Sequence, residues 1–112
     1  MHLNLTPEAL LIQLGYPKNK HTLKQINEII DNTEGFKYFS GHILSFNDAL
    51  AVEKGFISMS NSEEYFKIKC DEDSSADNLS AFTEMVKHWS GKYKVELKKV
   101  DNKNTYYIIG QQ

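Results

Sequence analysis

The most reactive side chains in this 112-residue sequence are one cysteine and four histidines: Cys70, His2, His21, His42 and His88. They are scattered, whereas zinc ligands usually come as closely spaced Cys or His pairs, so they predict no metal site. The candidate acid–base or nucleophilic pairs are His42 with Asp48, and Cys70 with a histidine brought near by folding. The sequence has neither a glycine-rich phosphate loop nor a nucleophile elbow. A small enzyme of unknown class is therefore the last of three functional hypotheses, and no cofactor is expected.

An acidic segment, residues 71–77, invites comparison with a calcium-binding loop. Asp71 and Asp73 have the spacing that begins an EF-hand loop, but Ala76 stands where such a loop needs its turn glycine. Phe82 occupies the position of the bidentate glutamate. The pattern therefore excludes a standard EF-hand, and the acidic residues are better explained as partners for the positive end of a following helix.

All 13 basic residues are lysine, and the chain has no arginine. It therefore lacks the planar guanidinium fork, the commonest device for bidentate recognition of guanine, phosphate or carboxylate. Residues 1–46 carry four lysines and four acidic residues, residues 47–86 carry three and nine, and residues 87–112 carry six and two. A basic C-terminal segment thus follows an acidic middle. The net charge of −2 gives no overall field to attract nucleic acid or an anionic membrane.

The candidate nucleic-acid contacts are the six lysines of the C-terminal segment: Lys87, Lys92, Lys94, Lys98, Lys99 and Lys103. If residues 92–100 form a strand, alternate lysines project from one of its faces and could follow a phosphate backbone. Lysine-mediated nucleic-acid binding of low sequence specificity, through the C-terminal helix and hairpin, is therefore the alternative function. A solvated lysine face that discourages edge-to-edge aggregation explains the same residues.

Aromatic residues are plentiful, with six tyrosines, six phenylalanines and one tryptophan. Core positions should absorb most of them. The candidate partner-binding residues are Tyr65, Tyr106 and Tyr107, because tyrosine offers a large contact area at low entropic cost. The leading hypothesis is a small non-catalytic interaction or regulatory module. It would bind a protein partner, or a second copy of itself, through a sheet edge or an aromatic patch.

The clearest structural signal is a helix followed by a hairpin. Apolar residues recur every three or four positions over residues 78–90, which predicts an amphipathic helix with Ser75 or Asp77 as N-cap and Gly91 as its end. The predicted hairpin comprises residues 92–100, a polar turn at 101–104 and residues 105–109. We expect the fold to be built on this unit, because helical period, strand period and turn chemistry agree there.

Two short helices are predicted near the N-terminus. Residues 7–14 have Thr6 as a natural N-cap, and residues 22–32 begin with a capping box of Thr22 and Gln25. The outer face of the second helix is mixed in charge. We therefore expect the two helices to pack as an αα-hairpin rather than to read DNA.

Residues 36–59 are the most ambiguous part of the chain. Composition or alternation favours three strands, at residues 36–39, 42–46 and 49–52. A competing interpretation is a short helix over residues 48–54, capped by Asn47 and stopped by Gly55. The strand interpretation is the one we expect, with a further strand at residues 56–59.

Residues 64–70 alternate cleanly between apolar and polar side chains, with Phe66, Ile68 and Cys70 on one face, as in a strand with one wet face. The chain, residues 1–112, is therefore predicted to be a single α+β domain. Two N-terminal helices and one later helix would pack on a mainly antiparallel sheet, in the order α-α-β-β-β-α-β-β.

The sequence also suggests a location. A single cysteine cannot form an internal disulfide, and the apolar run near the N-terminus is too short for an export signal or a membrane span. We therefore expect a soluble cytoplasmic protein with no membrane partner.

Overall fold

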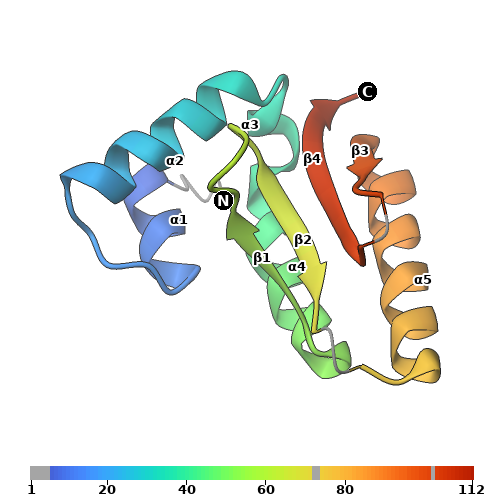
Figure 1. Cartoon of the computed structure of the whole chain (residues 1–112). Coiled ribbons are helices and arrows are strands. Elements are labelled where there is room, and N and C mark those ends of the chain that lie inside the picture. The colour runs from blue at the N-terminus through green and yellow to red at the C-terminus, as the bar shows by residue number, and fades with distance from the viewer. Residues whose placement is uncertain (1–5, 72–73, 102) are drawn as a thin grey trace.

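The computed structural model describes residues 6–71, 74–101 and 103–112 (Figure 1). The helices are α1 (Pro7–Gln13), α2 (Lys20–Asn32), α3 (Phe36–Phe39), α4 (Ile43–Leu50) and α5 (Ala76–Tyr93), with short 3-10 turns η1 (Ser40–His42) and η2 (Ala51–Glu53) on either side of α4. The strands are β1 (Gly55–Met59), β2 (Phe66–Cys70), β3 (Val95–Lys99) and β4 (Thr105–Gln111). The α+β class predicted from the sequence is confirmed.

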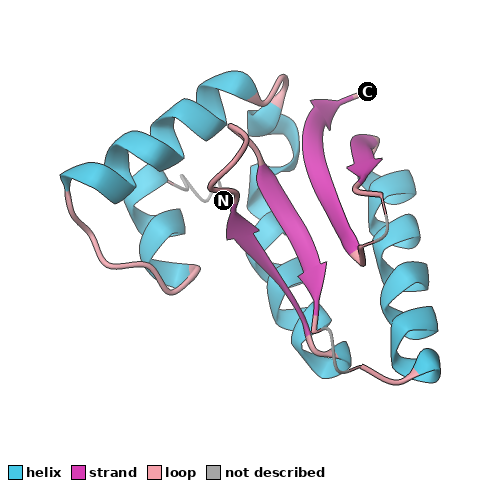
Figure 2. Cartoon of the chain, in the orientation of Figure 1, coloured by secondary structure: helices cyan, strands magenta, loops and turns pink. Residues whose placement is uncertain are grey.

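The four strands form one antiparallel sheet in the order β1-β2-β4-β3. Figure 2 shows α4 passing behind the sheet and α5 beside β3, while α1 and α2 lie beyond the β1 edge. Alternate strand residues, among them Ile57, Phe66, Ile68 and Ile108, are buried beneath α4 and α5. As expected for strands with one wet face, their neighbours in the sequence point the other way.

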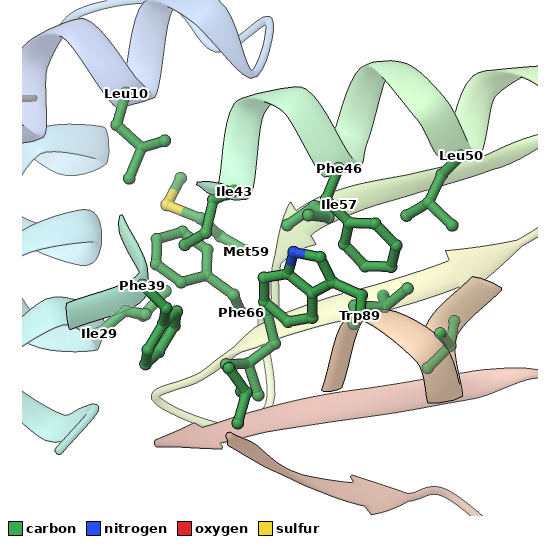
Figure 3. Close-up of a cluster of buried hydrophobic side chains, with 14 of the residues drawn as sticks. Leu10, Ile29, Phe39, Ile43, Phe46, Leu50, Ile57, Met59, Phe66 and Trp89 are labelled. Atoms are coloured by element: carbon green, nitrogen blue, oxygen red, sulfur yellow. The ribbon is translucent and has the colours of Figure 1, made fainter. Parts of the chain in front are cut away.

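The core is centred on an aromatic stack between α4 and α5 (Figure 3). The rings of Phe46 and Trp89 lie nearly parallel, 3° apart in plane and 4.5 Å between centroids. Phe39 meets the edge of the same indole ring at 6.1 Å. Because α5 covers β3 and α4 covers β1, this stack joins the two halves of the helical layer over the sheet.

The strands predicted over residues 36–52 are wrong, because this region is helical. Ile43, Phe46 and Leu50 are all buried, and their spacing of three and four residues places them on one face of a helix. The competing prediction of a helix over residues 48–54 was closer to the structure, although α4 starts earlier, at Ile43. Asn47 is not its cap: the Asn47 side chain instead accepts a hydrogen bond from the backbone of β1.

The helix and hairpin predicted at the C-terminus are present with shifted bounds. Ser75, one of the two predicted N-caps, accepts a hydrogen bond from the backbone N–H of Asn78. Gly91 does not end α5, which continues to Tyr93 and stops where Lys94 takes a left-handed conformation (φ 58°). Tyr93 therefore belongs to the helix and not to the strand. From the end of α5 its ring stacks on the ring of His42. This packing outweighs the cost of about 1 kcal/mol of a glycine inside a helix.

The N-terminal helices form the predicted αα-hairpin, with one cap reassigned. Thr6 caps α1 as expected, through a hydrogen bond from the backbone N–H of Ala9. The N-cap of α2 is Asn19, one turn before the predicted Thr22. Thr22 is still part of a capping box, because its hydroxyl accepts from the backbone N–H of Asn19.

Candidate interaction surface

One face of the sheet, which we call the open face, is covered by none of the described helices (Figure 1). Two rows of side chains cross it, as the strand register shows. The first row is Ser58, Lys67, Tyr107 and Lys98; the second is Phe56, Lys69 and Thr105. The open face therefore combines lysines with aromatic rings, whereas the covered face of the same strands is apolar.

Two of the three predicted partner-binding tyrosines meet at one end of this face. The ring centroids of Tyr65 and Tyr107 are 6.0 Å apart, with a 44° angle between the ring planes. Tyr107 lies between Lys67 on β2 and Lys98 on β3, its register partners. Both tyrosines are half-buried, so they combine a fixed position with accessible area.

Tyr106, the third predicted residue, points to the opposite face. Its ring lies 6.3 Å from that of Phe82 on α5, and it packs against the core. Adjacent strand residues point to opposite faces, so a pair such as Tyr106 and Tyr107 cannot share one surface. The structure thus separates the three candidates into a surface pair and a core residue.

The turn between β1 and β2 holds the tyrosine pair in place. Ser60 is buried, and its hydroxyl accepts hydrogen bonds from the backbone N–H groups of Ser62 and Glu63. Its backbone N–H donates to the carbonyl of Tyr65 at 3.1 Å. The Ser62 hydroxyl in turn lies 3.4 Å from the Tyr107 hydroxyl. Hydrogen bonds from Ser62, and then from Ser60, lower the pKa of Tyr107, because they favour the phenolate.

A groove of about 440 Å³ runs along the open face from this turn to the β3–β4 turn. Lys67, Lys69 and Lys103 line it, together with the Tyr107 ring and small polar residues of the two turns. We call it the lysine groove. None of the described residues that line it is Asp or Glu. Ion pairs within the described chain join Lys18 to Glu8 and Lys24 to Glu28, so no groove lysine takes part in one.

A neighbouring hollow of about 500 Å³ lies between α2 and the β1–β2 turn. It is lined by charges of both signs, including the paired Lys24 and Glu28 and the turn residues Glu63 and Glu64. Residues 60–62 line both hollows. With one lysine against three glutamates, the lining of this second hollow is net acidic, which distinguishes it from the lysine groove.

The six lysines predicted as nucleic-acid contacts do not form one face. Lys98 and Lys103 lie on or beside the open face, where Lys67 and Lys69 join them. Lys99 is the register partner of Tyr106 and shares the covered face. The rest are on or after α5: Lys87 is exposed there, Lys92 sits over the Tyr93 ring at 5.4 Å, and Lys94 ends the helix.

Lys67 and Lys69 were missing from the sequence-based site, although their alternation with Phe66, Ile68 and Cys70 had placed them on the wet face of a strand. What the sequence did not reveal is that β4 lies beside β2, which sets Tyr107 next to Lys67. Strand adjacency is therefore the missing signal.

The outer edge of β1 is already occupied by side chains. The backbone N–H of Ile57 donates to the Asn47 side-chain oxygen at 2.8 Å, and that of Met59 donates to the Tyr16 hydroxyl at 2.9 Å. An incoming strand would have to displace both hydrogen bonds. This edge is thus poorly suited to adding a partner strand.

The other edge strand, β3, is short and carries charge. Glu96, Lys98 and Lys99 are exposed along it, and the Ser90 hydroxyl of α5 donates to the Val95 carbonyl at 2.8 Å. Short, lysine-bearing edges typically resist pairing with another strand. The open face is therefore a better candidate surface than either edge.

The residues considered for catalysis are not brought together. His42 precedes α4 and stacks on Tyr93 at 4.0 Å, while Asp48 is exposed, six residues further along. Cys70 is buried, and its sulfur lies 3.3 Å from the Ser74 hydroxyl. No group of three or more His, Cys, Asp or Glu in residues 6–71, 74–101 and 103–112 could hold a metal ion. His2 and Asp73 lie outside the described residues.

No described helix has both the length and the apolar character needed to cross a membrane. Searches against protein-family models, curated protein sequences and solved structures find no match to this chain.

Proposed function

We propose that this chain is a small, non-catalytic cytoplasmic interaction module that binds a protein partner through the open face of its sheet. The observation that carries the proposal is the meeting of Tyr65 and Tyr107 on a face that no described helix covers. Half-buried tyrosines with fixed rings are well suited to anchor a partner, because little side-chain entropy is lost on binding.

The open face is favoured over the sheet edges on physical grounds. The backbone groups of β1 that a partner strand would use already bond to Asn47 and Tyr16. On the open face, in contrast, the tyrosine pair is held by hydrogen bonds of the β1–β2 turn and stays accessible. A partner therefore meets a preorganised surface there and does not need to break existing bonds.

Photo-cross-linking tests this function. A photoreactive phenylalanine analogue at Asn61, an exposed turn residue beside the tyrosine pair, should form an adduct with the partner in cells. The same analogue at Tyr38, an exposed tyrosine on α3 that is 68% accessible, is the matched control. Adding Tyr65→Ala or Tyr107→Ala should abolish the Asn61 adduct. Equal adducts from both positions, or none from Asn61, would overturn the proposal.

The same experiment addresses self-association. An adduct of twice the chain mass, together with a dimer in light scattering after size-exclusion chromatography, identifies the partner as a second copy. A heavier or lighter adduct identifies a different protein. Either result supports binding through the open face, provided that it depends on Tyr65 and Tyr107.

Nucleic-acid binding is the second candidate, supported by one observation. Lys98 and Lys103 of the basic C-terminal segment share the open face with Lys67 and Lys69, which concentrates positive charge there. A mobility-shift titration with single-stranded DNA and RNA at low salt tests it, because phosphate contacts give a steep dependence on salt. If neither nucleic acid shifts at low salt, this candidate fails.

A further inference from the structure

None of the described residues that line the lysine groove carries a negative charge to offset its lysines. Lys67, Lys69 and Lys103 line it, no carboxylate does, and neither of the two ion pairs of the described chain includes these lysines. Three ammonium groups along one hollow repel one another, and a bound anion relieves that repulsion. The groove is therefore complementary in charge to an anionic occupant.

We propose that the lysine groove binds a short acidic peptide segment of the partner protein in an extended conformation. This inference rests on the proposed function and adds the chemistry of the segment recognised. The segment would lie along β2 and β4, with its carboxylates on Lys67, Lys69 and Lys103 and one end against the Tyr65–Tyr107 pair.

The spacing of the lysines favours an extended peptide. Lys67 and Lys69 are two residues apart on β2 and point to the same face. Such positions are separated by about 6.6 Å along a strand, and carboxylates at alternate positions of an extended peptide have the same separation. A segment with Asp or Glu at every second residue therefore matches these two lysines in register.

The surroundings of the groove favour a short peptide over a nucleic acid. Glu63 and Glu64 are exposed at the turn that forms one end, and Asp71 and Asp101 are exposed beside residues that form the other. A polyanion longer than the groove would meet these carboxylates at both ends. A short segment whose carboxylates are confined to the groove lysines avoids them.

The aromatic rings point to the same choice. Single-stranded nucleic acids are held by stacking bases on open ring faces and by phosphate contacts. Tyr65 and Tyr107 are half-buried and tilted against each other, and the Tyr107 hydroxyl is engaged with Ser62. Neither ring offers a flat, open platform. The chain also has no arginine for bidentate phosphate contacts.

Fluorescence anisotropy with the full chain tests the proposal. The probe is a short fluorescein-labelled peptide with glutamate at alternate positions and serine between them. Its control replaces each glutamate by glutamine. We expect saturable binding of the glutamate peptide at low ionic strength, weaker binding as salt is added, and no binding of the glutamine peptide.

Two double variants with the same change in net charge locate the binding site. Lys67→Gln with Lys69→Gln should weaken binding about tenfold, which corresponds to about 1.4 kcal/mol. Lys87→Gln with Lys92→Gln, on α5, should leave it within about twofold, because these lysines lie outside the groove. The fluorescence of the single tryptophan, Trp89, monitors thermal unfolding and checks that both variants fold.

The inference would be overturned by equal loss in both double variants, by equal binding of the glutamate and glutamine peptides, or by no saturable binding. Tighter binding of a single-stranded oligonucleotide that depends on Lys67 and Lys69 would also overturn it, and would assign the groove to nucleic acid. The Asn61 cross-linking experiment distinguishes a failure of the acidic-peptide inference from a failure of the proposed function. If the adduct forms but the acidic peptide does not bind, the interaction surface stands and only its chemistry is wrong.

Discussion

Replacing Phe46 by alanine should strongly destabilise the protein. Phe46 and Trp89 are each only 5% accessible, and their stacked rings join α4 to α5 above the sheet. The substitution deletes the whole ring and leaves a cavity against the indole. Compared with the same substitution at Ile43, the effect tests whether residues 43–50 form the helix that the structure shows or the strand that their composition suggests.

The expected magnitude follows from burial. Removing a buried phenylalanine ring typically costs about 3–5 kcal/mol of unfolding free energy, including the cavity left behind. For a domain of this size, each kcal/mol lowers the melting temperature by about 4 °C, so the shift should be about 12–20 °C. Because the whole domain is stable by only about 5–15 kcal/mol, a complete loss of folding is also within this range. Phe46→Leu, which keeps much of the volume, should cost about 1–1.5 kcal/mol.

Thermal and urea unfolding, followed by Trp89 fluorescence and far-ultraviolet circular dichroism, measure the effect. Val52→Ala is the control, because Val52 is 79% accessible and its loss should change stability by no more than about 0.5 kcal/mol. Ile43→Ala should also destabilise by about 2–5 kcal/mol, since Ile43 is fully buried on the same helical face. In a strand, residues three apart face opposite ways. A large effect at only one of Ile43 and Phe46 would therefore refute the helical assignment.

Three further predictions concern hydrogen bonds and backbone geometry. Asn47→Ala should lower the free energy of unfolding by about 1–3 kcal/mol and speed hydrogen exchange at the Ile57 amide, because this N–H loses its acceptor. Unchanged exchange would show that the Asn47 side chain does not protect the outer edge of β1. Ser62→Ala should raise the pKa of Tyr107, as measured by absorbance or NMR titration. Since the native hydrogen bonds lower this pKa, they add further stability as pH rises through the folded pKa, so the difference in stability between parent and variant should be larger above that pKa than at pH 7. Gly35→Ala should destabilise by at least about 1–2 kcal/mol, because Gly35 has a φ of 68° and an added Cβ would collide with a side chain of β4; equal melting temperatures would show that the loop relaxes freely.

Local signals in the sequence were enough to locate helix starts and one strand where these signals agreed with one another. Thr6 and Ser75 were identifiable as N-caps, because the helix-favouring residues that follow them leave backbone N–H groups to be bonded. The alternation of Phe66, Ile68 and Cys70 identified β2 and its buried face. The capping hydrogen bonds join residues three apart, and the alternation lies within one strand, so each signal is contained in a short segment of the sequence.

Local signals failed where distant contacts decide the structure. The segment from Phe36 to Val52 has strand-like composition, yet it is helical, because Ile43, Phe46 and Leu50 fill the space between the sheet and α5. Gly91 resembles a helix stop, but contacts with Tyr93 carry the helix past it. In both places the energy of tertiary packing exceeds a local preference of about 1 kcal/mol or less per residue.

The candidate site shows the same division. The sequence alone determined the chemistry available: tyrosines and lysines without arginine, and a β2 strand whose polar face carries Lys67 and Lys69. Only the tertiary structure decided which of these residues meet. The placement of β4 beside β2 sets Tyr107 against Lys67 and Tyr65, and strand alternation turns Tyr106 into the core. The order of the strands depends on contacts between segments about forty residues apart. A surface built from side chains of both strands therefore cannot be predicted from either segment alone.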